Sequence, residues 1–577
     1  MKVVMARKAG FCMGVRRAVQ LAIKASYEAE KPVYTYGPLI HNEQALKLLE
    51  MLGVKPLDKI PLKARGTIII RAHGVPPQDK ERLKEAGFKV IDGTCPRVSR
   101  VQALARRYSR EGYHVLIVGD PDHAEVKGIL GYAGERGIVV SNFRDLESLP
   151  SLQKYVILSQ TTQDEEFFKL ISEEILARFP GGKVYNTICN ATHDRQREVR
   201  NLCRECDAIV VVGGKHSANT KRLAMIAREE GKDVFLVETA EELDLEKLRK
   251  YRKVGVTAGA STPNWVINQV IRTLEELPSP YESSLVRWGR KFLRFLMESN
   301  LALAFGAALL SAAVLLAGGY PFEPRLPLLA ALFLFAAHTV NRLVDLKSLR
   351  LNDPFRAQFL EKNRKVFALA TLVSYLLALL LAWHLEPAAF VLVSILAVGS
   401  VLYSLPLFGR GEHFSPVQRV PGARSLFIAL GWWAILCLLP AIVFEYRSVL
   451  SWLGAIVFLV AFMRAVLLEL LELQGDGFVG KETLPVFIGP RKTFLVLKFC
   501  WLGFGVSILG GLIWGGLLAE GALLFVAFLY AYFVLHQYEK ELLGRDFYLE
   551  LLAEGLPVTT ALSLLAAVGV NRLVAKG

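Results

Sequence analysis

The sequence predicts two parts: a three-lobed α/β domain over residues 1–280 and an all-α membrane domain of about nine transmembrane helices over residues 295–577. Two observations carry this prediction. With 577 residues, the chain is too long for a single core. Its apolar residues, 53% of the total, form short runs between charged helical stretches up to residue 280 and long runs from Phe295 onward. Residues 281–294 contain a basic cluster and are the expected linker.

Short apolar runs in the first part predict β-strands separated by helices. The runs are Val33–Tyr36, Thr67–Arg71, His114–Val118, Tyr155–Leu158, Ala208–Val212, Val234–Val237 and Lys253–Thr257. Helices are predicted between them, for example over Val101–Glu111 and Asp164–Phe179. This alternation favours mostly parallel sheets, with functional residues in the loops at the carboxyl ends of the strands. The chain starts without the pattern of a signal peptide, so its first residues are interpreted as another strand and this half is expected in the cytoplasm.

Nine apolar segments of the second part approach the ~20 residues that are needed to cross a bilayer. They are Phe295–Ala317, Pro327–Val344, Val366–Trp383, Pro387–Tyr403, Ser425–Phe444, Leu450–Leu471, Phe494–Trp514, Ala522–Leu535 and Thr559–Val574. The loops after the second, fourth, sixth and eighth segments are rich in Lys and Arg, which predicts that they face the cytoplasm. The sequence therefore predicts a multi-pass protein of the cell (inner) membrane.

Charge and cysteine content narrow the possible functions. The net charge of +15 fits basic cytoplasmic loops, and no interleaving of aromatic and basic residues indicates nucleic-acid binding. Membrane lipid is instead an expected partner. In the cytoplasm, the five cysteines of the first part are expected as ligands or free thiols and not as disulfides. Cys203 and Cys206 form a CxxC pair, but no second pair lies near it, so we do not predict a zinc site there.

Three cysteines lie in similar local settings. Cys12, Cys95 and Cys189 each precede a helical stretch, at spacings of 83 and 94 residues. This pattern predicts one ligand from each of three related lobes. Cluster irons usually take four thiolates, so three would leave one iron with an open position that can act as a Lewis acid. Taken singly, each cysteine is more often a buried free thiol.

Nine ordered segments resemble the LytB/IspH family of 4-hydroxy-3-methylbut-2-enyl diphosphate (HMBPP) reductases. They are GFCMGVRRAV (10–19), GPLIHN (37–42), AHGV (72–75), DGTCP (92–96), HAEVKG (123–128), SQTT (159–162), TICNATHDRQ (187–196), GGKHSANT (213–220) and TAGASTP (257–263). Ala124 and Ala218 depart from the Pro and Ser that are common in the family. The resemblance implies a 4Fe-4S cluster on Cys12, Cys95 and Cys189. It also implies an electron donor such as ferredoxin or flavodoxin.

The reaction that this resemblance implies is a reductive dehydroxylation in the methylerythritol phosphate pathway. Two electrons and two protons remove the hydroxyl of HMBPP as water and leave isopentenyl or dimethylallyl diphosphate. Glu125 is the implied proton donor, with Thr161 as its relay. The residues that the resemblance places at the substrate are His41, His73, His123, Thr161, Thr162, Ser217, Asn219 and Ser261. Gly-rich loops among them let backbone N–H groups approach an anion.

The second part resembles the UbiA-type intramembrane prenyltransferases. ELLELQGDGFVGKETLP, over 469–485, is similar to their second acidic motif, and YSLP (403–406) and RSLFIALGW (424–432) are similar to their central loop and fifth span. Carboxylates four residues apart share one side of a helix and suit Mg²⁺, which prefers oxygen ligands. The implied Mg²⁺ ligands are Asn341, Asp345, Glu469, Glu472 and Asp476, and the implied diphosphate ligands are Arg424 and Lys481.

The first acidic motif of this part departs from the family pattern Asn-Asp-x-x-Asp-x-x-x-Asp. Asn341 and Asp345 persist, whereas Arg342 and Leu349 replace two acids, and Glu472 stands where Asp is usual in the second motif. Two metals held in the usual way are therefore in question. One alternative is a single metal, with Arg342 taking over some of the charge. Another is that this half no longer performs transfer chemistry.

Three hypotheses follow from the sequence. The first is a bifunctional enzyme with a reductase and a prenyltransferase in one chain. The second is a reductase whose membrane half acts as an anchor or binds a lipid or a partner. The third is a membrane receptor or transporter with a cluster-bearing sensor, which predicts that residues 1–280 do not turn over HMBPP.

Overall fold

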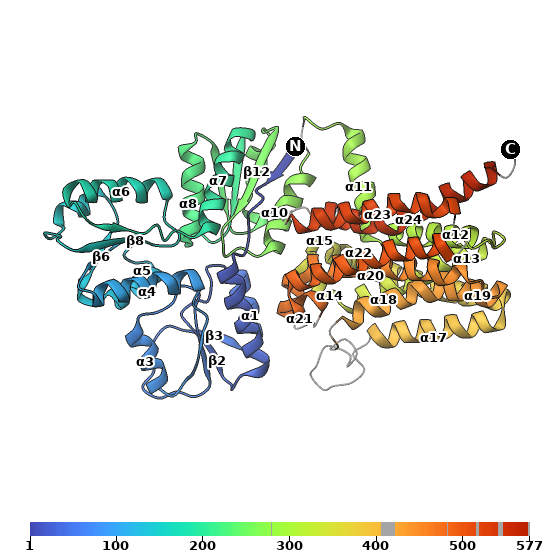
Figure 1. Ribbon diagram of the computed structural model, residues 1–577, viewed down its shortest axis with the longest axis horizontal. Coiled ribbons are helices and arrows are strands. Elements are labelled where there is room, and N and C mark those ends of the chain that lie inside the picture. The colour runs from blue at the N-terminus through green and yellow to red at the C-terminus, as the bar shows by residue number, and fades with distance from the viewer. Residues whose placement is uncertain are drawn as a thin grey trace. The chain divides into compact units, whose positions relative to one another are not determined.

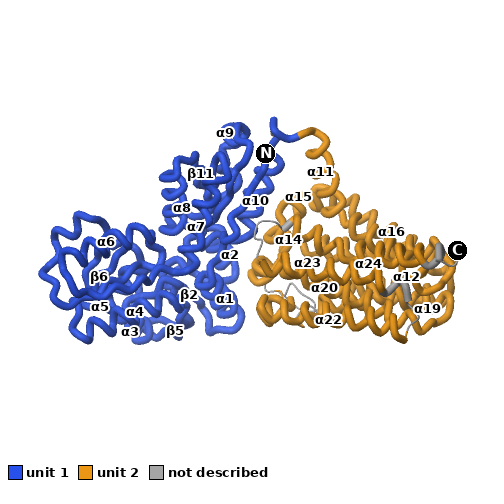
Figure 2. Tube along the Cα trace, turned by 45° about the horizontal axis from the view of Figure 1, so that its top comes forward, with its two compact units in different colours: residues 1–282 blue, residues 283–577 orange. Residues whose placement is uncertain are grey.

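The computed structural model describes residues 1–278, 280–404, 420, 422–479, 481, 483–514, 518–540 and 546–574. The chain forms two compact units, Met1–Glu282 and Ser283–Gly577 (Figure 2). Most of the segment that we expected as a linker is helical, because helix α11 spans Ser284–Glu298.

Unit 1 contains three four-stranded sheets, one in each lobe (Figure 1). Their strand orders are β1-β12-β10-β11, β3-β2-β4-β5 and β7-β6-β8-β9, and all the pairings are parallel. The strands are β1 Lys2–Met5, β2 Val33–Tyr36, β3 Val54–Leu57, β4 Thr67–Ile70, β5 Lys89–Asp92, β6 His114–Val118, β7 Gly137–Val140, β8 Tyr155–Ser159, β9 Lys183–Val184, β10 Ala208–Val212, β11 Asp233–Val237 and β12 Lys253–Ala258. The predicted three-lobed α/β class with parallel sheets is confirmed.

Parallel strands need crossover connections, and helices supply them. The helices are α1 Met13–Glu28, α2 Glu43–Met51, α3 Pro77–Glu85, α4 Pro96–Arg110, α5 Ala124–Ala133, α6 Glu165–Arg178, α7 Asn190–Glu205, α8 Ala218–Glu229, α9 Leu245–Leu248 and α10 Asn264–Glu276. In the third sheet, Val115 and Ile117 of β6 pack under α4 and α5, whereas Leu116 and Val118 pack under α6 on the other face. Figure 1 shows this sheet between the two helical layers. Burial on both faces explains why its central strands are continuous apolar runs.

The sequence prediction missed four strands: β3, β5, β7 and β9. Each of them lies at an edge of its sheet. An edge strand is covered less completely and tolerates charged residues and proline. Strand β3 reads VKPL, and both residues of β9 are exposed. The apolar signal that marks a central strand is therefore weak or absent in these segments.

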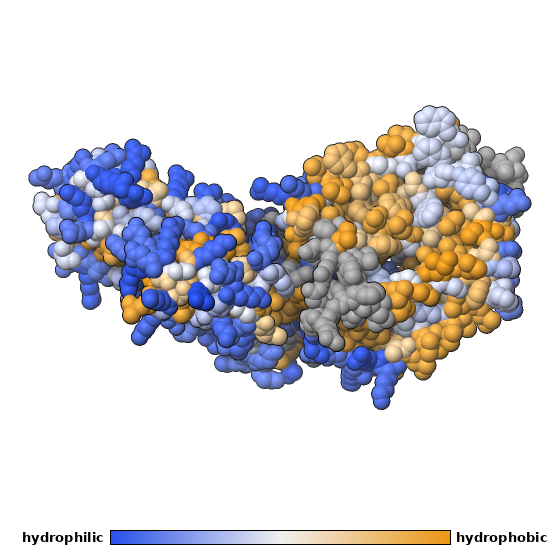
Figure 3. Space-filling view, turned by 90° about the horizontal axis from the view of Figure 1, so that it is seen from below, coloured by the Kyte–Doolittle hydropathy of each residue, from blue (hydrophilic) through white to orange (hydrophobic). Residues whose placement is uncertain are grey.

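Unit 2 is entirely helical in its described part. Its helices are α11 Ser284–Glu298, α12 Leu301–Ala317, α13 Arg325–Val344, α14 Leu346–Asn352, α15 Pro354–Lys362, α16 Arg364–Leu385, α17 Pro387–Ser404, α18 Ala423–Trp433, α19 Leu439–Phe444, α20 Val449–Val479, α21 Leu484–Ile488, α22 Pro490–Trp514, α23 Leu518–Glu539 and α24 Asp546–Val574, with a π-helical turn at Ala434–Leu438. Eight helices are long and apolar enough to cross a membrane, and α11 with α12 forms a bent pair that brings the number to nine. Large hydrophobic areas cover the surface of this unit in Figure 3. These features fit a multi-pass membrane domain.

Most spans are longer than the sequence predicted, and α20 and α24 differ by the most. Helix α20 continues through the acidic motif to Val479, and α24 begins at Asp546, well before the predicted Thr559. The early part of α24 was missed because it carries Glu550 and Glu554. In the structure both carboxylates are paired inside the unit: Arg356 donates two hydrogen bonds to Glu550 at 2.7 and 2.9 Å, and Arg464 binds Glu554. Pairing removes much of the penalty for burying these charges, so the helix continues among its neighbours.

Candidate active site

The three predicted cysteine ligands occupy equivalent positions in the three lobes. Cys12, Cys95 and Cys189 are the N-cap residues of α1, α4 and α7, and each follows an edge strand of its sheet. The backbone N–H of each donates to a carbonyl in the loop after the neighbouring strand, at 3.1, 2.9 and 2.9 Å respectively. The accepting residues are Ala260, Ala72 and Thr161. Because the positive end of a helix dipole stabilises a thiolate, all three positions favour ligating cysteines.

Gly14 allows two of these cysteines to approach each other. A Cβ atom at Gly14 would lie 2.6 Å from the Sγ of Cys95 and 3.9 Å from the Sγ of Cys12. The first distance is far below a van der Waals contact, so any side chain at this position would push α1 away from Cys95. Gly14, in the first turn of α1, is therefore required for the close approach of the cysteines.

Arg195 is a charged neighbour of the cysteines to which the sequence interpretation gave no role. Its side chain is buried, and it donates to the Gly10 carbonyl at 2.6 Å and to the Ala191 carbonyl at 2.9 Å. The guanidinium interacts electrostatically with the thiols of Cys12 and Cys189. The sequence could have indicated this role, because Arg195 lies in the segment TICNATHDRQ that also contains Cys189. A buried cation here offsets the negative charge of thiolates.

Glu125 and Thr161 form a buried pair, as the resemblance implied. Glu125 lies in the first turn of α5 and is 1% exposed. It accepts a hydrogen bond from the Thr161 backbone N–H at 2.7 Å and one from the Thr161 hydroxyl at 2.8 Å. Burial raises the pKa of Glu125 to about 7, although both hydrogen bonds act in the opposite direction. A carboxyl group with this pKa can carry and release a proton near neutral pH.

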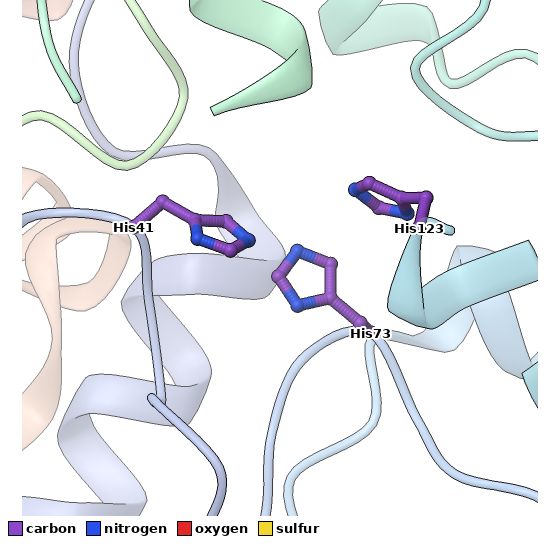
Figure 4. A group of neighbouring side chains, drawn as sticks. All are labelled: His41, His73 and His123. Atoms are coloured by element: carbon purple, nitrogen blue, oxygen red, sulfur yellow. The ribbon is translucent and has the colours of Figure 1, made fainter. Parts of the chain in front are cut away.

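Three histidines from separate loops face one another, as Figure 4 shows. The ring centroids of His41 and His73 are 5.1 Å apart, and those of His73 and His123 are 5.3 Å apart. Burial lowers the pKa of all three, for His123 to about 4 and for His73 well below its usual value. They are therefore neutral at pH 7 and offer N–H groups and not imidazolium charges to a ligand. His123 caps α5 through Nδ1, which accepts from the Glu125 backbone N–H at 3.2 Å and leaves Nε2 as the N–H donor.

The predicted short polar donors lie at the start of α8 and in the loop after β12. Ser217 is the N-cap residue of α8, and Asn219 in its first turn has a buried side-chain N–H₂ without a partner among the described residues. The Ser261 hydroxyl donates to the His41 carbonyl at 3.1 Å, which joins two lobes. Gly214 lies against the same carbonyl, since a Cβ there would be 2.4 Å from it. A helix N-terminus with additional donors is a suitable environment for a phosphate group.

A single cavity collects these groups. Its walls include all of the predicted site residues of unit 1: Cys12, His41, His73, Cys95, His123, Glu125, Thr161, Thr162, Cys189, Ser217, Asn219 and Ser261. Arg195 also lines it. The CxxC pair is elsewhere: Cys203 and Cys206 are buried, and burial raises the pKa of Cys203 to about 11. That pair is therefore a set of inert thiols.

Unit 2 contains a second cavity, which is lined by charged and polar groups. Six of the seven residues predicted for the membrane site line it: Asn341, Asp345, Arg424, Glu469, Glu472 and Lys481. The seventh, Asp476, is fully buried behind the wall and accepts from the Ser348 hydroxyl at 2.8 Å and from the Asn352 side-chain N–H₂ at 3.1 Å. Leu405 and Pro406 of the segment YSLP and Gly480 of the acidic motif lie outside the described residues. So do Arg410, Arg419 and Arg545, which belong to the basic loops after the fourth and eighth predicted spans.

Charged groups of opposite sign meet in this second cavity. Arg424 donates to Glu472 at 3.1 Å, and Lys481 contacts Asp345 and lies 3.6 Å from Asp476. Arg342 and Arg464 also line the cavity, and sequence reasoning gave Arg464 no role. Gly475 is required for the approach of α14, since a Cβ there would lie 2.0 Å from Asn352 Oδ1. Ser348 and Asn352 were also missed, because nothing in their local sequence separates them from ordinary helix residues.

The fold and the first cavity define a class: trilobed α/β proteins in which one cysteine from each lobe caps a helix beside a common polar cavity. The chain belongs to the LytB family, since the family described as LytB protein matches residues 3–275. A relative from Aquifex aeolicus, named 4-hydroxy-3-methylbut-2-enyl diphosphate reductase, is 45% identical over 278 residues, which are 48% of this chain and 96% of that protein. A solved structure of a reductase with this name covers 48% of the chain and 100% of its own, at 45% identity and a TM-score of 0.39.

One solved structure similar to the chain is described as a UbiA homologue. It comes from Archaeoglobus fulgidus and was solved with DMAPP and Mg²⁺. It covers 48% of this chain and 99% of its own, at 15% identity and a TM-score of 0.37.

Proposed function

We propose that residues 1–280 reduce HMBPP to isopentenyl and dimethylallyl diphosphate, with two electrons and two protons consumed and water released. The observation that carries this proposal is the Glu125–Thr161 pair in a cavity that three helix-capping cysteines also line. The name of the Aquifex relative supports the same reaction, because this chain covers nearly all of that protein.

The donor set fits an iron–sulfur cluster of the 4Fe-4S type. Cys12, Cys95 and Cys189 are equivalent caps on three helices, and Arg195 supplies a buried positive charge beside two of them. When bound, such a cluster supplies the electrons and one Lewis-acidic iron. Ferredoxin or flavodoxin is the proposed class of electron donor.

The residues around the cavity would bind the substrate through its diphosphate. His123 presents its Nε2–H group, and Asn219 presents a buried N–H₂ that has no partner among the described residues. Ser217 caps α8 and so lies at the first turn of that helix. These groups are neutral donors that a buried anion needs. The negative charge of a bound diphosphate would raise the pKa of these neutral histidines, so substrate binding is expected to take up protons.

Glu125 would supply the proton for the leaving hydroxyl. Because its pKa is about 7, the carboxyl group holds a proton for about half of the time at neutral pH. The protonated carboxyl donates to the Thr161 hydroxyl, which passes its own proton to the oxygen that leaves as water. The cavity wall buries Glu125, so a proton reaches the reacting atoms through Thr161 and not through bulk water.

Anaerobic purification of the full chain, followed by iron and sulfide counting and an HMBPP turnover assay, tests this proposal. We expect a cluster content near one per chain and formation of both C5 products. A chain that binds a full cluster but leaves HMBPP unchanged would instead support the receptor or transporter hypothesis.

For unit 2 we propose Mg²⁺-dependent transfer of a prenyl group from a prenyl diphosphate. Two buried carboxylate oxygens, Glu469 Oε2 and Asp476 Oδ2, have no hydrogen-bond partner among the described residues, which fits a cation site. Two acids of the family pattern are replaced here, so we propose one metal, with the Arg342 guanidinium supplying the remaining positive charge. Arg342 Nη1 is likewise buried without a partner in the described part of the chain.

Release of diphosphate by the full chain in bilayers tests this second function. We expect release that depends on Mg²⁺ and is lost in Asp476→Ala. Glu386→Ala, which changes an exposed acid at the start of α17, is the matched control and should leave release unchanged. No release across a panel of prenyl diphosphates and acceptors would favour the membrane half as an anchor or lipid-binding domain.

We also propose that unit 1 and the basic loops of unit 2 are on the cytoplasmic side of the inner membrane. The support is the distribution of Lys and Arg along the sequence. Protease accessibility of unit 1 in sealed inside-out and right-side-out vesicles would distinguish the two orientations.

A further inference from the structure

Helix α11 meets the first membrane helix at a sharp, fixed bend. The axes of α11 and α12 differ by 74°. Between them lie Ser299 and Asn300, and Asn300 has a left-handed backbone conformation with φ of 64°. Its side-chain N–H₂ donates to the Thr339 hydroxyl of α13 at 3.0 Å, and the Ser299 hydroxyl donates to the Phe295 carbonyl at 2.6 Å. The bend is therefore held by hydrogen bonds to α11 and to a neighbouring span.

One face of α11 exposes large apolar side chains. Leu285, Trp288, Phe292 and Phe295 follow the three- and four-residue spacing of one helix face. Their exposed fractions are 78, 64, 47 and 45%, respectively. The rings of Trp288 and Phe292 are stacked with centroids 5.3 Å apart, so the stripe is continuous. A contiguous apolar face of this size on a helix next to a membrane span indicates an interaction surface.

The opposite face of the same helix is basic. Arg287, Arg290 and Arg294 lie on it, and Lys291 lies between this face and the stripe. Arg294 is buried, Arg287 and Arg290 are half-buried, and Lys291 is exposed. The Arg294 guanidinium lies over the Phe547 ring of α24 at 5.2 Å, which fixes the rotation of α11 about its axis. Consequently the opposite face packs against α24 at Arg294, and the apolar stripe is presented on a defined side with the exposed Lys291 at its edge.

We propose that α11 lies in the surface of the bilayer, with its apolar stripe at the boundary between head groups and acyl chains and the exposed Lys291 beside the stripe at the head groups of anionic lipid. Two observations select a lipid surface over a protein partner. If α12 crosses the membrane, a bend of 74° directs α11 along the bilayer plane. The aromatic stripe with an exposed cation, Lys291, at its edge matches the two layers of a membrane interface that contains anionic lipid.

Photo-crosslinking in nanodiscs tests this proposal on the full chain. p-Benzoylphenylalanine is placed at Trp288 or Phe292 in discs of phosphatidylcholine with a tenth phosphatidylglycerol, and the adducts are identified by mass spectrometry. We expect lipid adducts at both positions. The same probe at Leu62, which is 99% exposed on unit 1, is the matched control and should yield none. Adducts from position 288 or 292 to peptides of this chain or of a second copy would overturn the proposal.

The charge variants test the anionic component separately. Lys291→Gln removes the exposed cation that lies three residues from Trp288 and four from Phe295, and Arg290→Gln removes a half-buried cation from the opposite face. Each basic residue near an anionic surface contributes about 1 kcal/mol, so each change should lower the ratio of phosphatidylglycerol to phosphatidylcholine adducts by up to about fivefold. Total lipid adducts should stay constant. An unchanged ratio in the double variant would refute the role of anionic lipid.

Discussion

Replacing Glu125 by glutamine isolates the proposed proton transfer from the rest of the site. The side chain keeps its size, and the amide oxygen can still accept from the Thr161 N–H, which donates to Glu125 at 2.7 Å. The amide nitrogen can donate to the Thr161 hydroxyl, so the buried pair remains satisfied. What the variant loses is the acidic proton. The structure therefore predicts substrate binding without efficient dehydroxylation.

The expected size of the effect follows from the role of a general acid. Loss of such a group slows turnover by roughly 10²- to 10⁴-fold. Substrate affinity should change little, because the proposed diphosphate ligands are on other loops. Turnover is measured anaerobically with a chemical reductant, and binding of HMBPP is measured by calorimetry on the cluster-loaded protein. Glu174→Gln, an exposed residue that pairs with Arg178, is the matched control.

The pH dependence provides a second measurement on the same residue. The pKa of Glu125 is raised to about 7, so the acid form predominates below pH 7 and kcat/KM should fall as pH rises through that value. The Gln variant should lack this decline. Near-normal turnover of Glu125→Gln, or an unchanged alkaline decline in it, would remove Glu125 from the proton path.

The same pKa has a consequence for stability. Because the carboxyl binds its proton more tightly in the folded protein than in the unfolded chain, its contribution is present below pH 4.5 and is lost as pH rises to about 7. A pKa shift of this size corresponds to roughly 3 kcal/mol in the free energy of unfolding. Denaturant unfolding of the full chain and of its Glu125→Gln variant, each at pH 5 and at pH 8, would show this difference in stability. Equal pH dependence of the two proteins would contradict the raised pKa.

Three further predictions concern other residues. Cys12→Ser should lose both the iron–sulfur absorbance and the turnover of HMBPP, whereas Cys203→Ser should keep both; retention of both in Cys12→Ser would exclude it as a ligand. Gly14→Ala should lower the iron and sulfide content while the circular dichroism of the chain is kept, because a Cβ there lies 2.6 Å from the Cys95 Sγ; full loading would show that α1 moves freely. Glu554→Ala should lower the stability of unit 2 by about 3–5 kcal/mol, because it leaves buried Arg464 unpaired. Thermal unfolding in detergent measures this loss, with the exposed Glu539→Ala as control, and an equal midpoint in both variants would contradict it.

Local sequence was sufficient to predict the central strands and to identify the site residues that the motifs contain. Strands β6, β8 and β10 each contain a continuous apolar run because both faces of their sheets are covered, and that pattern can be recognised without coordinates. The edge strands could not be recognised in this way. Their positions depend on pairing with a neighbour that is distant in sequence, as β9 pairs with β8.

The chemistry of the site was predictable to a similar extent. The sequence pointed to Cys12, Glu125 and the histidines, and the structure gathers them in one cavity. The protonation states were not predictable, because burial by three lobes lowers the pKa of the histidines and raises that of Glu125. Desolvation depends on which surfaces meet, and no local pattern encodes it.

The sequence by itself determined the two-part organisation, the class of each part and the residue types at both sites, since these depend on composition, periodicity and short motifs. Only the tertiary structure decided that Arg195 lies beside the cysteines and that Ser348 and Asn352 donate to Asp476. It also decided that Glu550 and Glu554 of α24 pair with arginines of other helices. Each of these contacts joins residues on separate elements. Their energies come from burial and partner choice, which exist only after the elements have packed.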